Sequence, residues 1–160
     1  MTIHETISID AAPERVWALA GDLGRIADWV PALEVSALLG DERWSRLACG
    51  LEVRERILEH SDADRYWIAE VIEPPPPLTA VRTVLSVLGD RMQSSVGWMG
   101  RVEASDEADA REGAGSLARI LRDGLHTLRA EVEEVEHSSP RGAARRRPIA
   151  PRSRSCGEHG

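Results

Sequence analysis

The sequence predicts a single α+β domain, and three observations predict that class. The first is length, because 160 residues is a usual size for one domain. The second is a series of short segments in which apolar and polar residues alternate, as they do in half-buried strands. The third is a change to helical periodicity near the C-terminal end, where apolar residues occupy positions 117, 120, 121, 125, 128, 132 and 135.

The N-terminal part of the chain predicts one strand and two short helices. Isoleucine alternates with polar residues from Thr2 to Asp10, the pattern of a strand with one buried face. Pro13 and Glu14 then suit the first turn of a helix, where proline is tolerated and an acidic side chain faces the positive end of the helix dipole. A second short helix is expected from about Leu23 to Leu33.

Six further strands and one long helix complete the expected order. The strand-like stretches are Glu34–Leu39, Arg43–Cys49, Leu51–His60, Arg65–Ile72, about Thr79–Leu88 and about Ser94–Ala104. The proline run from Pro74 to Pro77 cannot donate to a sheet ladder, so it predicts a stiff connection along a sheet edge. The closing amphipathic helix is recognised from Leu117 onward.

Charge divides the chain into two parts. Residues 138–160 hold six arginines against one acid, a charge of +5, and residues 1–137 hold 14 arginines against 26 acids, a charge of −12. We therefore expect a folded domain at 1–137 and a disordered basic tail at 138–160. An acidic body disfavours nucleic acid as a specific partner.

Other function classes find no support in the sequence. The N-terminus lacks a basic flank and an apolar signal core, and no apolar run approaches the ~20 residues that span a bilayer, so the sequence predicts a cytoplasmic protein without a membrane span. No histidine or cysteine pair has metal-ligand spacing and no nucleotide fingerprint occurs, so no metal or cofactor is expected. Two cysteines, Cys49 and Cys156, are too few for a disulfide framework, and we expect no structural disulfide between them.

Several short motifs resemble, in their order along the chain, those of the START-like (SRPBCC) superfamily. The matching segments are E-T-I-S-I-D-A-A-P-E-R-V-W-A-L-A-G-D at 5–22 ("APxxVW"), W-V-P at 29–31, E-V-R-E-R-I at 52–57, G-W-M-G-R-V at 97–102 and G-L-H-T-L at 124–128 ("GLxxL"). The resemblance is to the polyketide cyclase/dehydrase-like proteins of that superfamily and covers residues 2–136. The proline run and the basic tail depart from the family pattern.

The resemblance implies a helix-grip fold. In this fold a curved antiparallel sheet of about six to seven strands wraps around the long C-terminal helix, two short helices follow the first strand, and a cavity lies between the sheet and the long helix. Members of the superfamily bind or transform sterols, lipids, polyketides and other apolar molecules. The fold alone does not choose among these activities.

Glu55 is the candidate catalytic residue. It stands between Val53 and Ile57 on a strand face that should be apolar. Burial raises the pKa of a carboxyl group, which suits general acid–base chemistry on an enolisable ligand. The alternative is a structural ion pair with a cross-strand arginine, for which Arg82 and Arg101 are the candidates.

The candidate ligand-binding residues follow from the inward phase of the strands and of the closing helix. Trp67 and Trp98 are the expected pocket walls, and Gly100 would leave room beside Trp98. The full set is Trp29, Val53, Ile57, Trp67, Ala69, Trp98, Gly100, Leu121 and Leu125. The alternative is that the indole rings simply fill the core in place of phenylalanine, which the chain lacks.

Two functional hypotheses remain open from the sequence. The first is a binding module for a hydrophobic small molecule, polyketide-, lipid- or sterol-like. The second is a polyketide cyclase, aromatase or dehydratase that uses the same cavity, with Glu55 as acid or base. The absence of a convergent set of three catalytic groups tilts the prediction toward binding, and a homodimer is left open.

Overall fold

The computed structural model describes residues 1–137, and residues 138–160, including Cys156 and the predicted basic tail, lie outside the described part. Ten elements follow in chain order: β1 (Thr2–Ile9), α1 (Pro13–Ala20), the 3₁₀ helix η1 (Leu23–Asp28), β2 (Leu33–Leu39), β3 (Glu42–Leu47), β4 (Glu52–Ser61), β5 (Tyr66–Ile72), β6 (Leu78–Gly89), β7 (Ser94–Ala104) and α2 (Glu107–His137). The predicted order of elements is confirmed.

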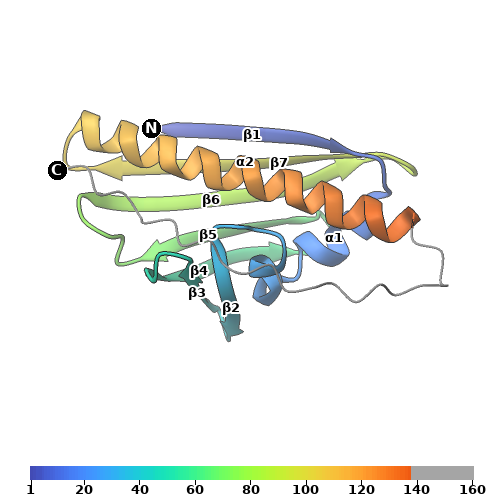
Figure 1. Ribbon diagram of the computed structural model, residues 1–160, viewed down its shortest axis with the longest axis horizontal. Coiled ribbons are helices and arrows are strands. Elements are labelled where there is room, and N and C mark those ends of the chain that lie inside the picture. Colours follow the sequence, from blue (N-terminus) through green and yellow to red (C-terminus); the bar gives the residue numbers. More distant parts are fainter. Residues whose placement is uncertain (138–160) are drawn as a thin grey trace.

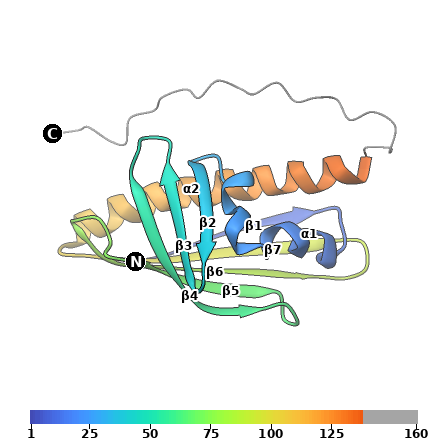
Figure 2. The ribbon, with the colours of Figure 1, turned by 90° about the horizontal axis from the view of Figure 1, so that it is seen from below.

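All seven strands form one antiparallel sheet in the order β1-β7-β6-β5-β4-β3-β2. Helix α2 packs on β1 and β7 and lies across them in Figure 1. The strands β2, β3 and β4 turn steeply away from the rest of the sheet in Figure 2, so the sheet curls around α2. This is the curved sheet and central helix that the helix-grip resemblance implies.

The alternation of side chains along the strands supplies the core beneath α2. Strand β6 buries Val81, Thr83, Leu85 and Val87, and the residues between them are less buried. Because strand side chains alternate between the two faces, this is one face of β6 turned toward the helix. The helix covers that face with its predicted apolar stripe, from which Leu121, Leu125, Leu128 and Val132 are buried.

Helix α2 begins ten residues before the predicted stripe. The carboxylate of Asp106 accepts the backbone N–H of Asp109 at 2.9 Å, which is the hydrogen bond of an N-cap. The first turns lie so close to the sheet that a Cβ at Gly113 would come within 2.7 Å of Leu78 Cδ2. Small residues therefore replace large apolar ones there, and the periodic signal does not extend into these turns.

One further expectation needs correction. The second short helix is a 3₁₀ helix that ends at Asp28, not at Leu33, because the backbone leaves the helical region at Trp29 (φ −128°). The expectation about a disulfide between Cys49 and Cys156 concerns a residue, Cys156, that lies outside the described part of the chain. Within residues 1–137, no helix combines the length and the apolar character needed to cross a membrane.

Candidate functional site

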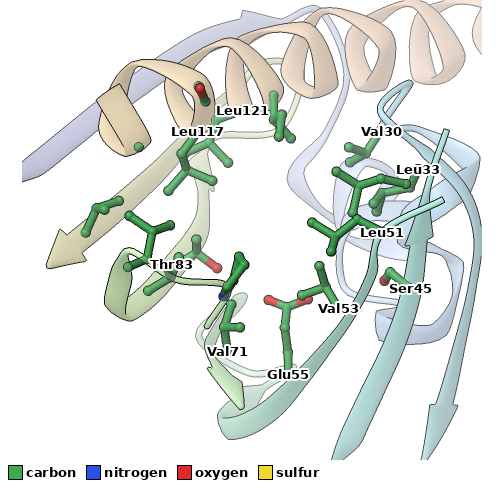
Figure 3. Close-up of a pocket in the computed structure, with 18 of the residues that line it drawn as sticks. Val30, Leu33, Ser45, Leu51, Val53, Glu55, Val71, Thr83, Leu117 and Leu121 are labelled. Carbon is green, nitrogen blue, oxygen red and sulfur yellow. The ribbon is translucent and has the colours of Figure 1, made fainter. Parts of the chain in front are cut away.

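A cavity of about 450 Å³ lies between the N-terminal half of α2 and the curved sheet. Figure 3 shows its walls, with Leu117 and Leu121 on the helix side and Val53, Glu55 and Val71 on the sheet side. Its lining residues are Ile26, Val30, Leu33, Arg43, Ser45, Leu47, Leu51, Val53, Glu55, Val71, Pro75, Pro76, Pro77, Leu78, Val81, Thr83, Trp98, Val102, Asp109, Glu112, Gly113, Ser116, Leu117, Ile120 and Leu121. Most of these side chains are aliphatic.

The mouth of the cavity is marked by lining residues that also reach the surface. These belong to three segments: Leu51 before β4, Pro76 and Pro77 between β5 and β6, and Glu112 and Ser116 on α2. The proline run thus forms part of the rim. Because proline has no backbone N–H, this part of the rim has fewer backbone donors that need a hydrogen-bond acceptor than other residues would give it.

The rim carries negative charge from α2. Asp109 and Glu112 both line the cavity. Partial desolvation and the neighbouring charges of Asp106 and Glu112 raise the pKa of Asp109. Two carboxyl groups at the entrance therefore face any molecule that enters.

Three tryptophans close the inner part of the space. Trp98 lines the cavity, and the Trp29 and Trp67 rings pack against it with centroids 5.1 Å and 5.9 Å away. Trp67 is fully buried and its indole Nε1 donates to the Ala20 carbonyl at 3.0 Å. Of the two readings of the indoles, Trp29 and Trp67 fill the core, whereas Trp98 borders both core and cavity.

Glu55 is held by an arginine that the sequence analysis did not consider. Arg43 stands directly across from it in the β3–β4 register, and its Nε donates to Glu55 Oε1 at 3.1 Å. The predicted partners are wrong, because Arg82 pairs with Glu70 and Arg101 with Glu103 on the exposed side of the sheet.

The Arg43 side chain is 1% exposed and is fixed from several sides. Besides the Glu55 bond, its Nη1 donates to the Leu23 carbonyl at 3.5 Å, and its guanidinium carbon lies 4.6 Å from the centre of the Trp67 ring. A cation over an indole face is attracted by the ring quadrupole. Trp67 does not line the cavity itself, but its ring packs against the guanidinium group of Arg43, which does.

The other predicted site residues divide into two groups. Val53, Glu55, Trp98 and Leu121 line the cavity. The remainder, Trp29, Ile57, Trp67, Ala69, Gly100 and Leu125, are not among its lining residues. The room expected beside Gly100 is occupied, because a Cβ there would lie 2.7 Å from Leu117 Cδ2.

The sequence analysis missed the polar residues of β3. Arg43 and Ser45 are two positions apart and share the inward face of that strand. The signal that could have found Arg43 was a β3–β4 register that places it opposite Glu55. Glu5, which shares the face of β1 that carries Ile3 and Ile7, pairs with Arg122 on α2 (Oε1 to Nη2, 2.9 Å) and does not line the cavity.

Other candidate groups lie elsewhere. The pKa of Tyr66 is raised, chiefly by the negative charge of Glu59, and Tyr66 does not line the cavity. Among residues 1–137, no cluster of three or more histidine, cysteine or carboxylate side chains is suited to a metal ion.

Comparison with solved structures places this fold among known proteins. The protein XoxI from Bacillus cereus is 26% identical, with a TM-score of 0.78 over 86% of this chain and 99% of that one. The Zhui aromatase/cyclase from Streptomyces sp. R1128 is 17% identical, with a TM-score of 0.71 over 84% of this chain and 94% of that one. A START superfamily protein from Mycobacterium smegmatis is 11% identical, with a TM-score of 0.71 over 84% of this chain and 98% of that one.

The last two likenesses show the fold alone, which is that of START proteins and of an aromatase/cyclase. Among curated proteins, none matches this sequence significantly. Residues 1–133 match the family described as polyketide cyclase / dehydrase and lipid transport. The match spans most of the chain, and the protein belongs to this family.

Proposed function

We propose that this protein binds a hydrophobic small molecule in the cavity between α2 and the curved sheet. The observation that carries the proposal is the cavity itself, about 450 Å³ with a mostly aliphatic wall and a mouth at the surface. Its volume falls within the range of ~300–1,000 Å³ typical of small-molecule sites.

The energetic cost of the space supports an occupant. Aliphatic side chains that border an open space of about 450 Å³ lack packing partners and face water instead, which is unfavourable for apolar surface. An apolar molecule that fills the space removes this wall from water and supplies the missing packing contacts.

Three features favour binding over catalysis. Glu55 Oε1 already accepts from Arg43, so one oxygen of the candidate acid or base is engaged. The other carboxyl groups of the cavity, Asp109 and Glu112, belong to the rim on α2. Most of the remaining wall cannot exchange a proton. The polar groups therefore suit the holding and orientation of a ligand.

A cyclase-type activity is the second candidate, and one observation favours it. Glu55 lies on the cavity wall beside Arg43, an arrangement in which a carboxylate could take a proton from a bound ketone. The Zhui protein, which shares this fold, is described as an aromatase/cyclase. In that case Glu55→Gln would bind a poly-ketone substrate with little change in affinity but would form no cyclised product.

The proposal is tested by native mass spectrometry of the purified protein, followed by organic extraction and by thermal-shift assays with polyketides, sterols and fatty-acid esters. We expect a bound apolar molecule after purification, or stabilisation by at least one of these compound classes. An empty protein that none of these compounds stabilises would contradict the proposal.

A further inference from the structure

The cavity wall carries polar groups that no protein atom satisfies. Among residues 1–137, the buried side-chain donors without a hydrogen-bond partner are Arg43 Nη2, Ser45 Oγ, Trp29 Nε1 and Trp98 Nε1. Three of the four belong to residues that line the cavity. Because a buried donor without a partner costs free energy, these groups need an acceptor from outside residues 1–137, either a water molecule or a ligand atom.

Two of these donors come from the same wall. Arg43 and Ser45 are two residues apart on β3, so both side chains point to the same face of the sheet. They are 1% and 2% exposed. In Figure 3 the Ser45 side chain lies on the sheet wall near Val53 and Glu55, opposite the leucines of α2. The cavity therefore has a polar sheet side and an apolar helix side.

Arg43 is preorganised to donate from one amino group. Its Nε is engaged by Glu55, its Nη1 by the Leu23 carbonyl, and its guanidinium carbon stacks over Trp67. Within the described part of the chain, Nη2 is the Arg43 nitrogen that has no acceptor. A ligand oxygen beside β3 would accept a hydrogen bond from Nη2 while the bonds to Glu55 and Leu23 are kept, once neighbouring side chains move to admit it, because Nη2 is buried.

Charge decides which kind of oxygen fits. The positive charge of Arg43 is already balanced by Glu55 across the ion pair. A ligand carboxylate would add an uncompensated negative charge to a site that excludes water, and it would have to pass Asp109 and Glu112 at the rim. A neutral carbonyl accepts the same hydrogen bonds at no such cost.

We infer that the ligand is an apolar molecule that carries a neutral carbonyl oxygen, which accepts hydrogen bonds from Arg43 and Ser45 on β3, and that carboxylates are discriminated against. This inference rests on the proposed function and adds the chemical class of the ligand. It separates ketones and esters from free fatty acids and from pure hydrocarbons.

Three probes of nearly equal shape test it: 2-acetylnaphthalene, 2-ethylnaphthalene and 2-naphthoate. Calorimetric titration should show that the ketone binds at least about tenfold more tightly than the hydrocarbon and the carboxylate, the effect of one good hydrogen bond and of one uncompensated charge. Equal affinity of the ketone and the hydrocarbon would overturn the inference and leave the proposed function standing. Failure of all three probes to bind would also overturn the inference, while the proposed function would still be decided by the native mass spectrometry and the wider compound panel.

Two variants assign the preference to the named residues. Ser45→Ala should reduce the advantage of the ketone over the hydrocarbon by several-fold while leaving hydrocarbon binding unchanged. Glu55→Gln removes the balancing charge, so affinity for 2-naphthoate should rise at least about tenfold. Glu103→Gln, which neutralises an exposed acid paired with Arg101 outside the cavity, is the charge-matched control and should leave all three affinities unchanged.

Two results with these variants would contradict the inference. Naphthoate affinity that rises no more in Glu55→Gln than in Glu103→Gln would show that the ion pair does not set the charge preference. A ketone advantage that persists in full in Ser45→Ala would remove Ser45 from the site. Since Ser45→Ala only deletes an unpartnered hydroxyl, the second result stands even if Glu55→Gln folds poorly.

Discussion

Arg43 buries a positive charge, which costs desolvation free energy on folding, and it also lines the cavity with a hydrogen-bond donor. Its side chain is almost fully buried, and Glu55, the Leu23 carbonyl and the Trp67 ring surround its guanidinium group. A buried ion pair contributes little net stability, because desolvation offsets much of the attraction. Removing one partner is different, since it leaves the other charge uncompensated.

Arg43→Ala should therefore lower the free energy of unfolding by about 3–5 kcal/mol, the usual effect of breaking a buried pair. Arg82→Ala is the matched control, because Arg82 forms its ion pair with Glu70 on the exposed side of the sheet. Its loss should cost less than about 1 kcal/mol. Urea unfolding of both variants gives the comparison, and similar midpoints would contradict the structural role given to Arg43.

Two serines on neighbouring strands provide a second test at the residue scale. Ser36 Oγ donates to the Gly24 carbonyl and accepts from the Ala27 N–H, whereas Ser45 Oγ has no partner. Ser36→Ala should cost about 1–3 kcal/mol because it leaves backbone groups unpaired, and Ser45→Ala should be neutral or stabilising. If thermal unfolding shows Ser45→Ala to be the more damaging change, its hydroxyl is satisfied in the ligand-free protein.

At the scale of elements, the N-terminal turns of α2 determine how closely the helix approaches the sheet. Gly113 and Gly115 stand two residues apart there, but only Gly113 faces other side chains. A Cβ at Gly113 would meet Leu78 and Val102 at 2.7 Å and 3.2 Å, and a Cβ at Gly115 would meet nothing within 4 Å.

Gly115→Ala should raise stability by about 0.5–1 kcal/mol, because alanine has the higher helix propensity and the site is open. Gly113→Ala should gain less or lose stability, because Leu78 must move to admit the new methyl group. Chemical denaturation of the two variants measures the difference. An equal gain in both would show that the helix does not pack as closely as the structure indicates.

The same elements show what the sequence could predict. The strand predicted at about Ser94–Ala104 has those bounds, and the other strands lie within two residues of their predicted bounds, since alternation is a local signal that turn residues delimit. The start of α2 was missed because close packing there selects glycine and alanine, which carry no apolar period. The partner of Glu55 was missed because cross-strand pairing depends on a register that no single segment encodes.

At the scale of the whole molecule, the curl of the sheet creates the cavity and the three tryptophans limit it. Trp29, Trp67 and Trp98 fill the inner space, and aliphatic side chains leave the rest open toward the rim. Residue patterns predicted the inward faces that surround this space. They could not divide those faces into packed core and open cavity, because that division depends on how far β2–β4 bend away from α2.

The most direct test of the central claim is to fill the cavity from its wall. Val53 lines the cavity from β4, and Leu58 is an exposed residue of the same strand that does not line it. Val53→Trp and Leu58→Trp are therefore matched in chemistry and strand but differ in whether the indole enters the cavity. Calorimetric titration with 2-acetylnaphthalene or with the molecule recovered from the purified protein compares them with the unchanged protein.

We predict that the unchanged protein and Leu58→Trp bind one equivalent and that Val53→Trp binds none while remaining folded. Ligand at 100 times its Kd should raise the Tm of the first two by roughly 5–15 °C, from about 2.7 kcal/mol of binding linkage, and leave Val53→Trp unchanged. Undiminished binding to a folded Val53→Trp would contradict the account, because the ligand would then occupy some other place on the molecule.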